Sequence, residues 1–406
     1  MPVRRLYMDN AATSFPKPAT VLDAMVHFAT GCGASAGRGG YAEAVECGRL
    51  LSEVRQRLCS LFNGADPRNF IFTLNCTDGL NLAIKGLVDP AGKGHAICSC
   101  IDHNSILRPL GTMEDRGWLA VTRVRVDPRD GLVDPAEIER AIRPDTRLIA
   151  ITHASNVTGS LQPLAAMARI AREHDVPLVV DAAQSAGHVE IDLRALDIDL
   201  LAAPGHKALL GPLGTGFLYI RPGLEKRLRP LKEGGTGSMS DLDRQPDFMP
   251  DRFEPGSHNA IGLIGLGAGL AWVIDRTIAQ LAEHERNLER TFIDGIGDVE
   301  GLHYYGPAGV RDRVGVFSVR VDGLPPGELS ETLEREYGIL TRSGIHCAPL
   351  AHRAIGTADT GGTTRFSFGP FLSVQDVQYA ADALADVALR RVKGTAKAAV
   401  NLGRGN

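Results

Sequence analysis

The sequence lacks any hydrophobic run long enough to cross a membrane. No stretch of about 18 uninterrupted apolar residues occurs. Residues 1–12 carry two arginines but no apolar core of the kind that secretory signals contain. We therefore expect no membrane span and no export signal.

The sequence also lacks an excess of positive charge. The 44 Lys and Arg residues are outnumbered by 48 Asp and Glu residues, and the net charge is −4. No long run of Lys or Arg occurs, so we exclude a protein that binds nucleic acid through bulk basicity. Hydrophobic residues make up 44% and charged residues 23% of the chain. Those values are ordinary for a globular protein, so disorder is not the dominant state.

The seven cysteines include no Cys-x2-Cys pair and are odd in number. In a long chain without a signal sequence they are read as reduced thiols, which places the protein in the cytoplasm. The spacing of His95, Cys98, Cys100 and His103 could suit zinc. Because both cysteines fall inside a predicted strand that separates the two histidines, we expect no metal.

Glycine, by contrast, is abundant. The chain has 46 glycines among 406 residues, which is about 11% against an ordinary ~7%. Such an excess indicates many tight turns and close backbone approaches, which often occur around anionic ligands.

Short apolar runs alternate with helical patterns through the first two thirds of the chain. The predicted strands are 70–74, 95–101, 119–126, 147–152, 177–182, 200–203 and 216–220. The predicted helices are 42–63, 77–84, 135–142 and 161–174. This alternation predicts an α/β fold with a mostly parallel central sheet covered by helices on both faces.

The pattern changes from about residue 301, where it predicts a smaller α+β domain. Its predicted strands are 314–321 and 364–368, and its helices are 326–337 and 374–389. We expect a large domain, a small domain completed by both ends of the chain, a helical connection and a flexible tail. The expected bounds are 16–260 for the large domain, 1–15 with 290–392 for the small one, 257–293 for the connection and 393–406 for the tail.

Polar or ionisable side chains follow five of the predicted strands. These segments are 75–77, 102–104, 153–156, 181–184 and 204–207. Because ligands of open α/β sheets bind beyond the carboxyl ends of the strands, we expect the five segments to meet at one site.

Three of these residues have chemistry that is specific in combination. The helix start at Thr77 suits a phosphate, although alone it could be an ordinary N-cap. Asp181 ends an apolar run, where a carboxylate needs a partner, although alone it could be structural. Lys207 could form a Schiff base if its pKa is lowered, although a lone lysine is usually solvated. Together they call for a group with a phosphate, a ring nitrogen and an aldehyde, which is pyridoxal 5'-phosphate.

The segments 181–184 and 205–207 resemble the class V aminotransferase group of fold-type I pyridoxal-phosphate enzymes. Within that group the sequence is most similar to cysteine desulfurases of the SufS-like and selenocysteine lyase-like kind. Supporting segments keep the family's order and spacing over roughly residues 5–390. They are 7–13, 75–82, 102–105, 155–159, 252–257 and 342–348.

The resemblance implies a role for each residue around the cofactor ring. Lys207 would bind the cofactor covalently and move the substrate's Cα proton. Asp181 would pair with the ring nitrogen, and His103 would stack on the ring. Gln184 would hydrogen-bond the ring hydroxyl, with Asn156 nearby.

The resemblance also implies a phosphate site shared between two subunits of a homodimer. Thr77, His206 and the backbone around Cys76 would hold the phosphate, and Ser257 would reach the phosphate of the neighbouring subunit. One departure is Pro204, where relatives have a Ser or Thr that donates to the phosphate; Pro204 has neither a hydroxyl nor an N–H. Either phosphate binding is weaker here, or residues 235–238 compensate.

Cys347 lies where the family's desulfurases carry their nucleophile. The resemblance implies that its thiolate removes sulfur from L-cysteine, leaving L-alanine and a persulfide that passes to an acceptor protein or a small thiol. Arg365, with Asn156, would hold the substrate carboxylate. We expect His346, Arg342 or His352 to lower the pKa of the thiol.

Three alternatives stay open at this point. A selenocysteine lyase could share every residue named. Another C–S lyase or an aminotransferase could use the same scaffold, although an aminotransferase has no need of Cys347. A non-catalytic scaffold would leave the co-occurrence of Lys207, Asp181 and Cys347 unexplained.

Overall fold

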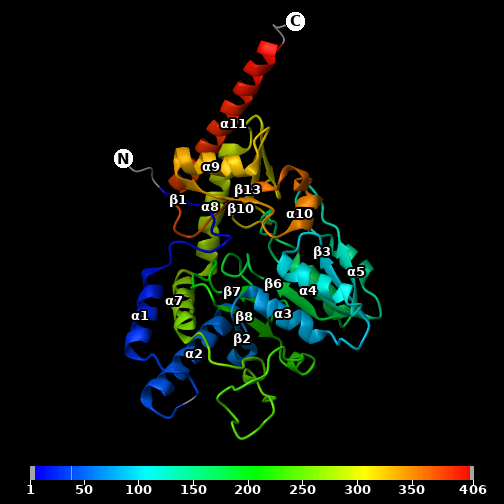
Figure 1. Ribbon diagram of the computed structural model, residues 1–406, viewed down its shortest axis with the longest axis vertical. Coiled ribbons are helices and arrows are strands. Elements are labelled where there is room, and N and C mark those ends of the chain that lie inside the picture. Colours follow the sequence, from blue (N-terminus) through cyan, green and yellow to red (C-terminus); the bar gives the residue numbers. More distant parts are fainter. Residues whose placement is uncertain (1–4, 38, 403–406) are drawn as a thin grey trace.

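A seven-stranded sheet forms the centre of the computed structural model, which describes residues 5–37 and 39–402 (Figure 1). The strand order is β2-β8-β7-β6-β5-β3-β4. The strands are β2 (Phe70–Thr73), β3 (Gly94–Ser99), β4 (Leu119–Val124), β5 (Thr146–Thr152), β6 (Leu178–Asp181), β7 (Leu200–Pro204) and β8 (Gly216–Ile220). β8 is antiparallel to both of its neighbours, and the run from β4 to β7 is parallel. The prediction of a mostly parallel sheet is therefore confirmed.

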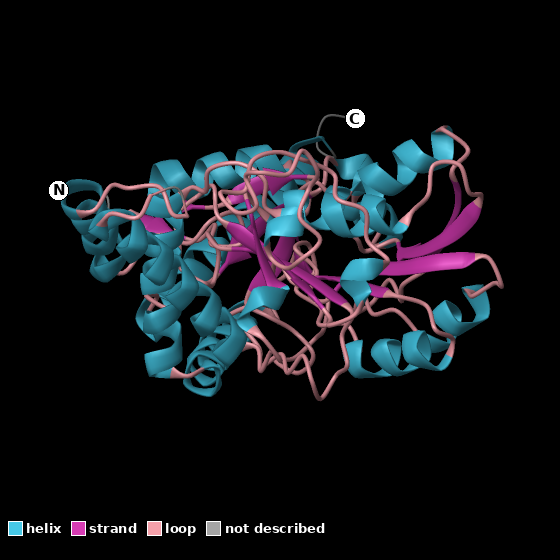
Figure 2. Ribbon diagram, turned by 90° about the horizontal axis from the view of Figure 1, so that it is seen from below, coloured by secondary structure: helices cyan, strands magenta, loops and turns pink. Residues whose placement is uncertain are grey.

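Helices cover both faces of this sheet, and strands run through the middle of the molecule between them (Figure 2). The helices of this part are α1 (Ala19–Gly31), α2 (Ala42–Leu61), α3 (Cys76–Leu87), α4 (Asn104–Asp115), α5 (Pro135–Ala141), α6 (Leu164–Glu173) and α7 (Ala260–Arg276). One core cluster joins a sheet face to α2, α6 and α7, and a second joins the opposite face to α3 and α4. Burial on both faces explains why the central strands read as continuous apolar runs.

A four-stranded antiparallel sheet of order β12-β13-β10-β9 forms the smaller part. Its strands are β9 (Leu302–Tyr305), β10 (Val316–Val321), β12 (Arg342–Gly344) and β13 (Thr363–Ser367), and its helices are α8 (Ile278–Ile296), α9 (Pro326–Tyr337), α10 (Pro349–Ala354) and α11 (Val374–Leu402). β1 (Leu6–Tyr7) pairs in parallel with β11 (Ile339–Leu340). The first residues of the chain therefore pack with its last third, in a core that includes Met8, Phe292 and Phe317.

The predicted helical stretch 257–293 consists of two helices, α7 and α8. α7 and α8 meet at Thr277, where φ is +59° and the axes differ by 81°. The hydroxyl of Thr277 accepts from the Gln280 N–H at 3.3 Å and so caps α8. Among the described residues no single helix is long and apolar enough to span a membrane, and only this bent pair passes by length and composition.

α11 continues to Leu402, so helix reaches into the segment 393–406 that was predicted to be a flexible tail. Residues 403–406 lie outside the described residues.

Candidate functional site

A cavity of about 320 Å³ lies at the carboxyl ends of the parallel strands, between the large and small parts. It brings together segments that follow β2, β3, β5, β6 and β7, as the strand-end argument predicted. The predicted residues that line it are Cys76, Thr77, His103, Asn156, Asp181, Gln184, His206, Lys207 and Arg365. Ser257 and Cys347 lie elsewhere and are described below.

Asp181 ends β6 and points a carboxylate into the cavity from a buried position. Its Oδ1 accepts from the Ala183 N–H at 2.9 Å and from the Cys76 thiol at 3.3 Å. Burial, reinforced by the Asp181 charge, raises the pKa of Cys76 well above its ordinary value, so this sulfur stays protonated and donates. Within the described chain Oδ2 has no hydrogen-bond partner, and it can accept from a protonated ring nitrogen.

Lys207 lies in the turn that follows β7. Burial lowers the pKa of its ammonium to about 8, although the Asp181 carboxylate opposes the shift. The turn is tight, because a Cβ at Gly205 would lie 2.3 Å from the Thr215 hydroxyl. Lys207 is thus an amine that is about half neutral near pH 8, far below the ordinary range for lysine, which favours its action as a Schiff-base nucleophile.

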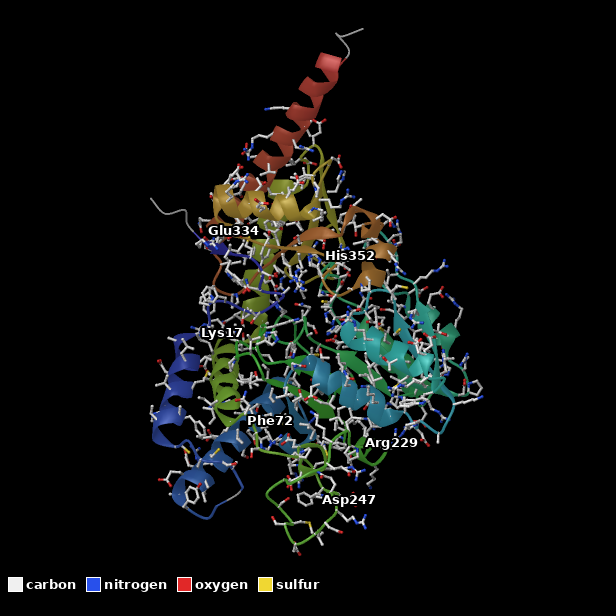
Figure 3. All side chains as sticks on the ribbon, in the orientation of Figure 1. Lys17, Phe72, Arg229, Asp247, Glu334 and His352 are labelled. Carbon is white, nitrogen blue, oxygen red and sulfur yellow. The ribbon has the colours of Figure 1, made fainter. Side chains whose placement is uncertain are left out.

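The N-terminal segment holds this turn in place, which the sequence did not predict. Lys17 Nζ donates to the His206 carbonyl at 2.7 Å, and the Ser14 hydroxyl donates to the Lys207 carbonyl at 2.8 Å. Figure 3 shows Lys17 at the junction of the large and small parts. Burial lowers the pKa of Lys17 to about 8. Contacts of this kind depend on tertiary folding, and no local pattern signals them.

His103 is the N-cap of α4 and is uncharged. Burial lowers its pKa to about 4, although Asp181 opposes the shift. Its Nδ1 accepts from the Ser105 N–H at 3.1 Å, so the ring proton is assigned to Nε2. A neutral, oriented imidazole ring suits stacking on a flat cofactor.

Two hydroxyls and a helix N-terminus meet at the phosphate end of the cavity. Thr77 Oγ1 lies 2.7 Å from Ser105 Oγ, so Ser105 joins the site although no role was predicted for it. α3 begins at Cys76, and the first amides of a helix have no partner within it. His206 adds a buried Nδ1 without a partner. Burial lowers the pKa of His206 to about 4, so the ring binds as a neutral donor.

Residues 235–238 do not compensate for Pro204 within one chain. They line a separate cavity with residues 239–246, and the Thr236 hydroxyl is engaged with Ser238 at 3.0 Å. Pro204 itself lines the catalytic cavity. The Thr77–Ser105 pair therefore supplies the hydroxyls on this side.

Arg365 is 1% exposed and is held from two sides. Its Nη2 donates to Asp9 Oδ1 at 2.6 Å and its Nη1 to the Asn156 carbonyl at 3.2 Å, while its Nε is buried without a partner. Asn156 Nδ2 donates to the His346 carbonyl at 2.6 Å, which ties the arginine to the Cys347 loop. The free Nε is a donor available to a substrate carboxylate.

Cys347 is exposed on a loop of unusual backbone conformation. His346 and Cys347 have φ values of +50° and +58°, in the left-handed region that side chains other than glycine rarely adopt. The Cys347 carbonyl accepts from the Asn104 N–H at 2.8 Å. The loop is thereby fastened to α4, and Cys347 lines a groove of about 320 Å³ that shares Thr77, His103 and Ser105 with the cavity.

Three residues near Cys347 were expected to lower the pKa of its thiol, namely His346, Arg342 and His352. Burial lowers the pKa of His346 to about 2 and that of His352, on α10 (Figure 3), to about 4, so neither carries positive charge. The remaining candidate is Arg342, whose Nη2 lies 4.0 Å from the Cys347 sulfur.

Ser257 does not face the cavity of its own chain. It is exposed and lines a second cavity of about 220 Å³ with Asp78, Lys232 and His258. The predicted role of Ser257 in a neighbouring subunit stays a prediction.

The zinc spacing has a simpler explanation. His95 is fully buried, and its two ring nitrogens lie 2.9 and 2.8 Å from the hydroxyls of Thr146 and Thr122. The described residues contain no cluster of three metal-ligating side chains.

The donor set fits pyridoxal phosphate. A carboxylate with a free oxygen, a lysine of lowered pKa, a neutral imidazole and a hydroxyl-lined helix N-terminus converge on one cavity. The unpartnered His206 Nδ1 gives the phosphate a further donor.

Comparisons with known proteins agree with this chemistry. The family model described as aminotransferase class-V matches residues 6–380. A probable cysteine desulfurase of Methanothermobacter thermautotrophicus is 33% identical over 387 residues, with 94% of each chain covered. A cysteine desulfurase of Escherichia coli is 32% identical over 84% of each chain.

Solved structures show the same similarity. The apo cysteine desulfurase of Thermococcus onnurineus matches with a TM-score of 0.87 at 30% identity, covering 95% of this chain and 94% of that one. The cysteine desulfurase CsdA of Escherichia coli matches with a TM-score of 0.82 at 28% identity, covering 95% and 94%.

Proposed function

The chain belongs to the class V aminotransferase family, and from that premise we propose that it works as a pyridoxal-phosphate-dependent cysteine desulfurase with Cys347 as the sulfur-accepting nucleophile. The observation that carries the proposal is the exposed Cys347 thiol on a loop fastened beside the cavity that contains Lys207 and Asp181. A transaminase has no use for such a thiol.

The residues of the cavity divide the work of holding the cofactor and the substrate. With pyridoxal phosphate bound, Asp181 would hold the ring nitrogen, Lys207 would hold the aldehyde carbon, and Thr77, Ser105 and His206 would hold the phosphate. When bound, pyridoxal phosphate serves as an electron sink for charge at the substrate's Cα.

Arg365 and Asn156 orient the substrate. The Arg365 guanidinium binds the substrate carboxylate through donors that include the free Nε, and Asp9 fixes its plane. Burial makes Lys207 a base of moderate strength, which can take the Cα proton and return it.

The sulfur step uses the thiolate of Cys347. Thiolate attack on the substrate sulfur forms an S–S bond while the C–S bond breaks. The carbon keeps the electron pair and takes a proton, giving alanine and a persulfide on Cys347. Arg342 Nη2 lies 4.0 Å from the Cys347 sulfur.

The working unit that we propose is a homodimer in the cytoplasm, which passes sulfur to an acceptor protein or a small thiol. Support for the dimer comes from Ser257, which faces away from its own cavity, and from the exposed apolar side chains of Leu22, Val26, Leu213 and Ile261. Support for the compartment comes from the cysteines, which are all free.

A substrate panel tests the function. L-cysteine, L-selenocysteine and L-cysteine sulfinate are each supplied to the holoenzyme, and alanine is measured together with the released sulfur or selenium species. With excess dithiothreitol present to cleave the Cys347 persulfide, we expect equal amounts of alanine and sulfide from cysteine and no pyruvate. Cys347→Ser should abolish both products, whereas Cys32→Ser, a change at another partly exposed thiol, should leave them intact. Turnover of selenocysteine alone would favour the lyase alternative.

A further inference from the structure

The groove at Cys347 is lined in part by side chains that have no role in the proposed desulfuration step. It runs between α3 and α4, and most of the residues that line it are polar, although apolar atoms make up more than half of the exposed lining. Thr77, Asn81 and Lys85 contribute one side along a single face of α3. On the other side, Arg108 and Thr112 project from α4.

The groove is cationic and has no carboxylate in its lining. Lys85 is half-buried and Arg108 is exposed, and within the described chain neither makes an ion pair. The nearest acid on α3 is Asp78, which lines the other cavity and pairs with Lys232 at 2.9 Å. With Arg342 beside the thiol, the groove leads from solvent to Cys347 past Lys85 and Arg108, two cations that form no ion pair with the described residues.

We infer that this groove binds the sulfur acceptor, and that the acceptor is a small thiol bearing carboxylates, of the glutathione class. The inference rests on the proposed function, because it assumes a persulfide at Cys347. Lys85 and Arg108 bind the carboxylates, and the acceptor's thiol reaches the Cys347 loop. The groove volume of about 320 Å³ is in the range of small-molecule sites, at roughly 300–1,000 Å³.

The transfer balances without any further oxidant or reductant. The acceptor thiolate attacks the outer sulfur of the Cys347 persulfide and forms a new S–S bond. The S–S bond to Cys347 breaks, and Cys347 leaves as a thiolate that Arg342 stabilises. The acceptor departs as a persulfide, and Cys347 is ready for the next substrate.

The first test compares two acceptors of nearly the same shape. With saturating L-cysteine, kcat/KM is measured for glutathione and for its diethyl ester, in which both carboxylates are masked. We expect wild type to prefer glutathione, and the ratio of the two values to fall about fivefold or more in the Lys85→Gln/Arg108→Gln double variant. High salt should reduce the wild-type preference.

A matched control removes two exposed cations from the opposite edge of the sheet. Lys93 directly precedes β3 and Lys226 lies beyond β8. The Lys93→Gln/Lys226→Gln variant should retain the wild-type ratio. An equal fall of the kcat/KM ratio in both double variants would mean a general effect of net charge and would overturn the inference.

A second test needs no desulfurase activity, so it separates failure of the groove from failure of the proposed function. Oxidised glutathione and its ethyl ester are offered to the protein, and the mixed disulfide at Cys347 is followed by peptide mass spectrometry. We expect faster reaction with the charged disulfide, and a loss of that advantage in Lys85→Gln/Arg108→Gln. Equal rates for both disulfides in wild type would overturn the inference and point to a protein acceptor recognised elsewhere.

Discussion

At the scale of single residues, burial sets the charge of each group in the site. It leaves His103, His206 and His346 neutral, and it brings the pKa of Lys207 down to about 8. The fixed charges are therefore Asp181 on one side of the cavity and the arginines 342 and 365 on the other. This arrangement suits an anionic substrate that enters beside a neutral amine.

The lowered pKa of Lys207 predicts a pH dependence for capture of the cofactor. Only the neutral amine attacks an aldehyde, so apoprotein should bind pyridoxal phosphate covalently at a rate that rises with pH around 8 rather than around 10.5, the ordinary lysine value. Visible absorbance during reconstitution gives the rate. Asp181 raises this pKa, so Asp181→Asn should move the midpoint below 8. A midpoint near 10.5 in wild type would show that Lys207 is not desolvated.

At the scale of elements, the central strands could be predicted from the sequence, but α4, β1 and the break between α7 and α8 could not. The central strands are buried on both faces, so each one appears in the sequence as a short apolar run whose ends mark the ends of the strand, as at 216–220. α4 has Pro109 inside it, and the two-residue strand β1 has no periodicity to detect. The break between α7 and α8 depends on a positive φ at Thr277, and no sequence pattern predicts that conformation for a threonine.

The site shows the same division. Residues that directly follow strands could be placed together, because the carboxyl ends of parallel strands meet at one edge. Asp9, Ser105 and Lys17 escaped assignment because their roles arise from contacts across the fold. The charge state of His346 escaped because burial, not residue type, decides it.

One buried ion pair joins α2 to the segment that carries Ser257. Arg55 donates to Glu254 at 2.5 and 2.8 Å, and the same carboxylate accepts from the Phe72 N–H at 2.5 Å. Burial alone would raise the pKa of Glu254, but Arg55 and His258 outweigh it and hold the pKa below its ordinary value. This carboxylate therefore stabilises the fold at neutral pH and loses that contribution as pH falls below about 4.5.

Arg55→Met should lower the free energy of unfolding by about 3–5 kcal/mol, because it leaves a buried carboxylate without its countercharge. Chemical denaturation at pH 7 measures the loss. Arg49→Met is the matched control, since Arg49 lies on the same helix and pairs with Glu46 at the surface, and we expect little change. The difference in the free energy of unfolding between wild type and Arg55→Met should become smaller as pH falls below about 4.5. A gap that is constant with pH would contradict the role given to Glu254.

At the scale of the whole molecule, the chain folds so that its ends complete the site from the small part. β1 pairs with β11, and Asp9 reaches Arg365 on β13. The cavity thus lies where two cores meet, and movement of one part relative to the other would change the position of Arg365 and Cys347 together.

A mixed dimer tests whether Ser257 acts across subunits. Lys207→Ala and Ser257→Asp should each inactivate a homodimer. In a heterodimer of the two, one site combines an intact Lys207 with the intact Ser257 of the other subunit. Co-expression with distinct affinity tags should therefore recover up to half of the wild-type activity. No recovery from a well-folded heterodimer would show that Ser257 serves its own chain or neither.

The persulfide on Cys347 is the central claim, and one turnover without acceptor measures it directly. Holoenzyme is mixed with L-cysteine alone. Mass spectrometry of the intact protein and of its peptides measures the added sulfur, and the released alanine is quantified in the same sample. We predict one added sulfur atom per chain, on the peptide that contains Cys347, in amounts equal to the alanine. Alanine released while Cys347 stays unmodified, or sulfur carried by another cysteine, would contradict the account.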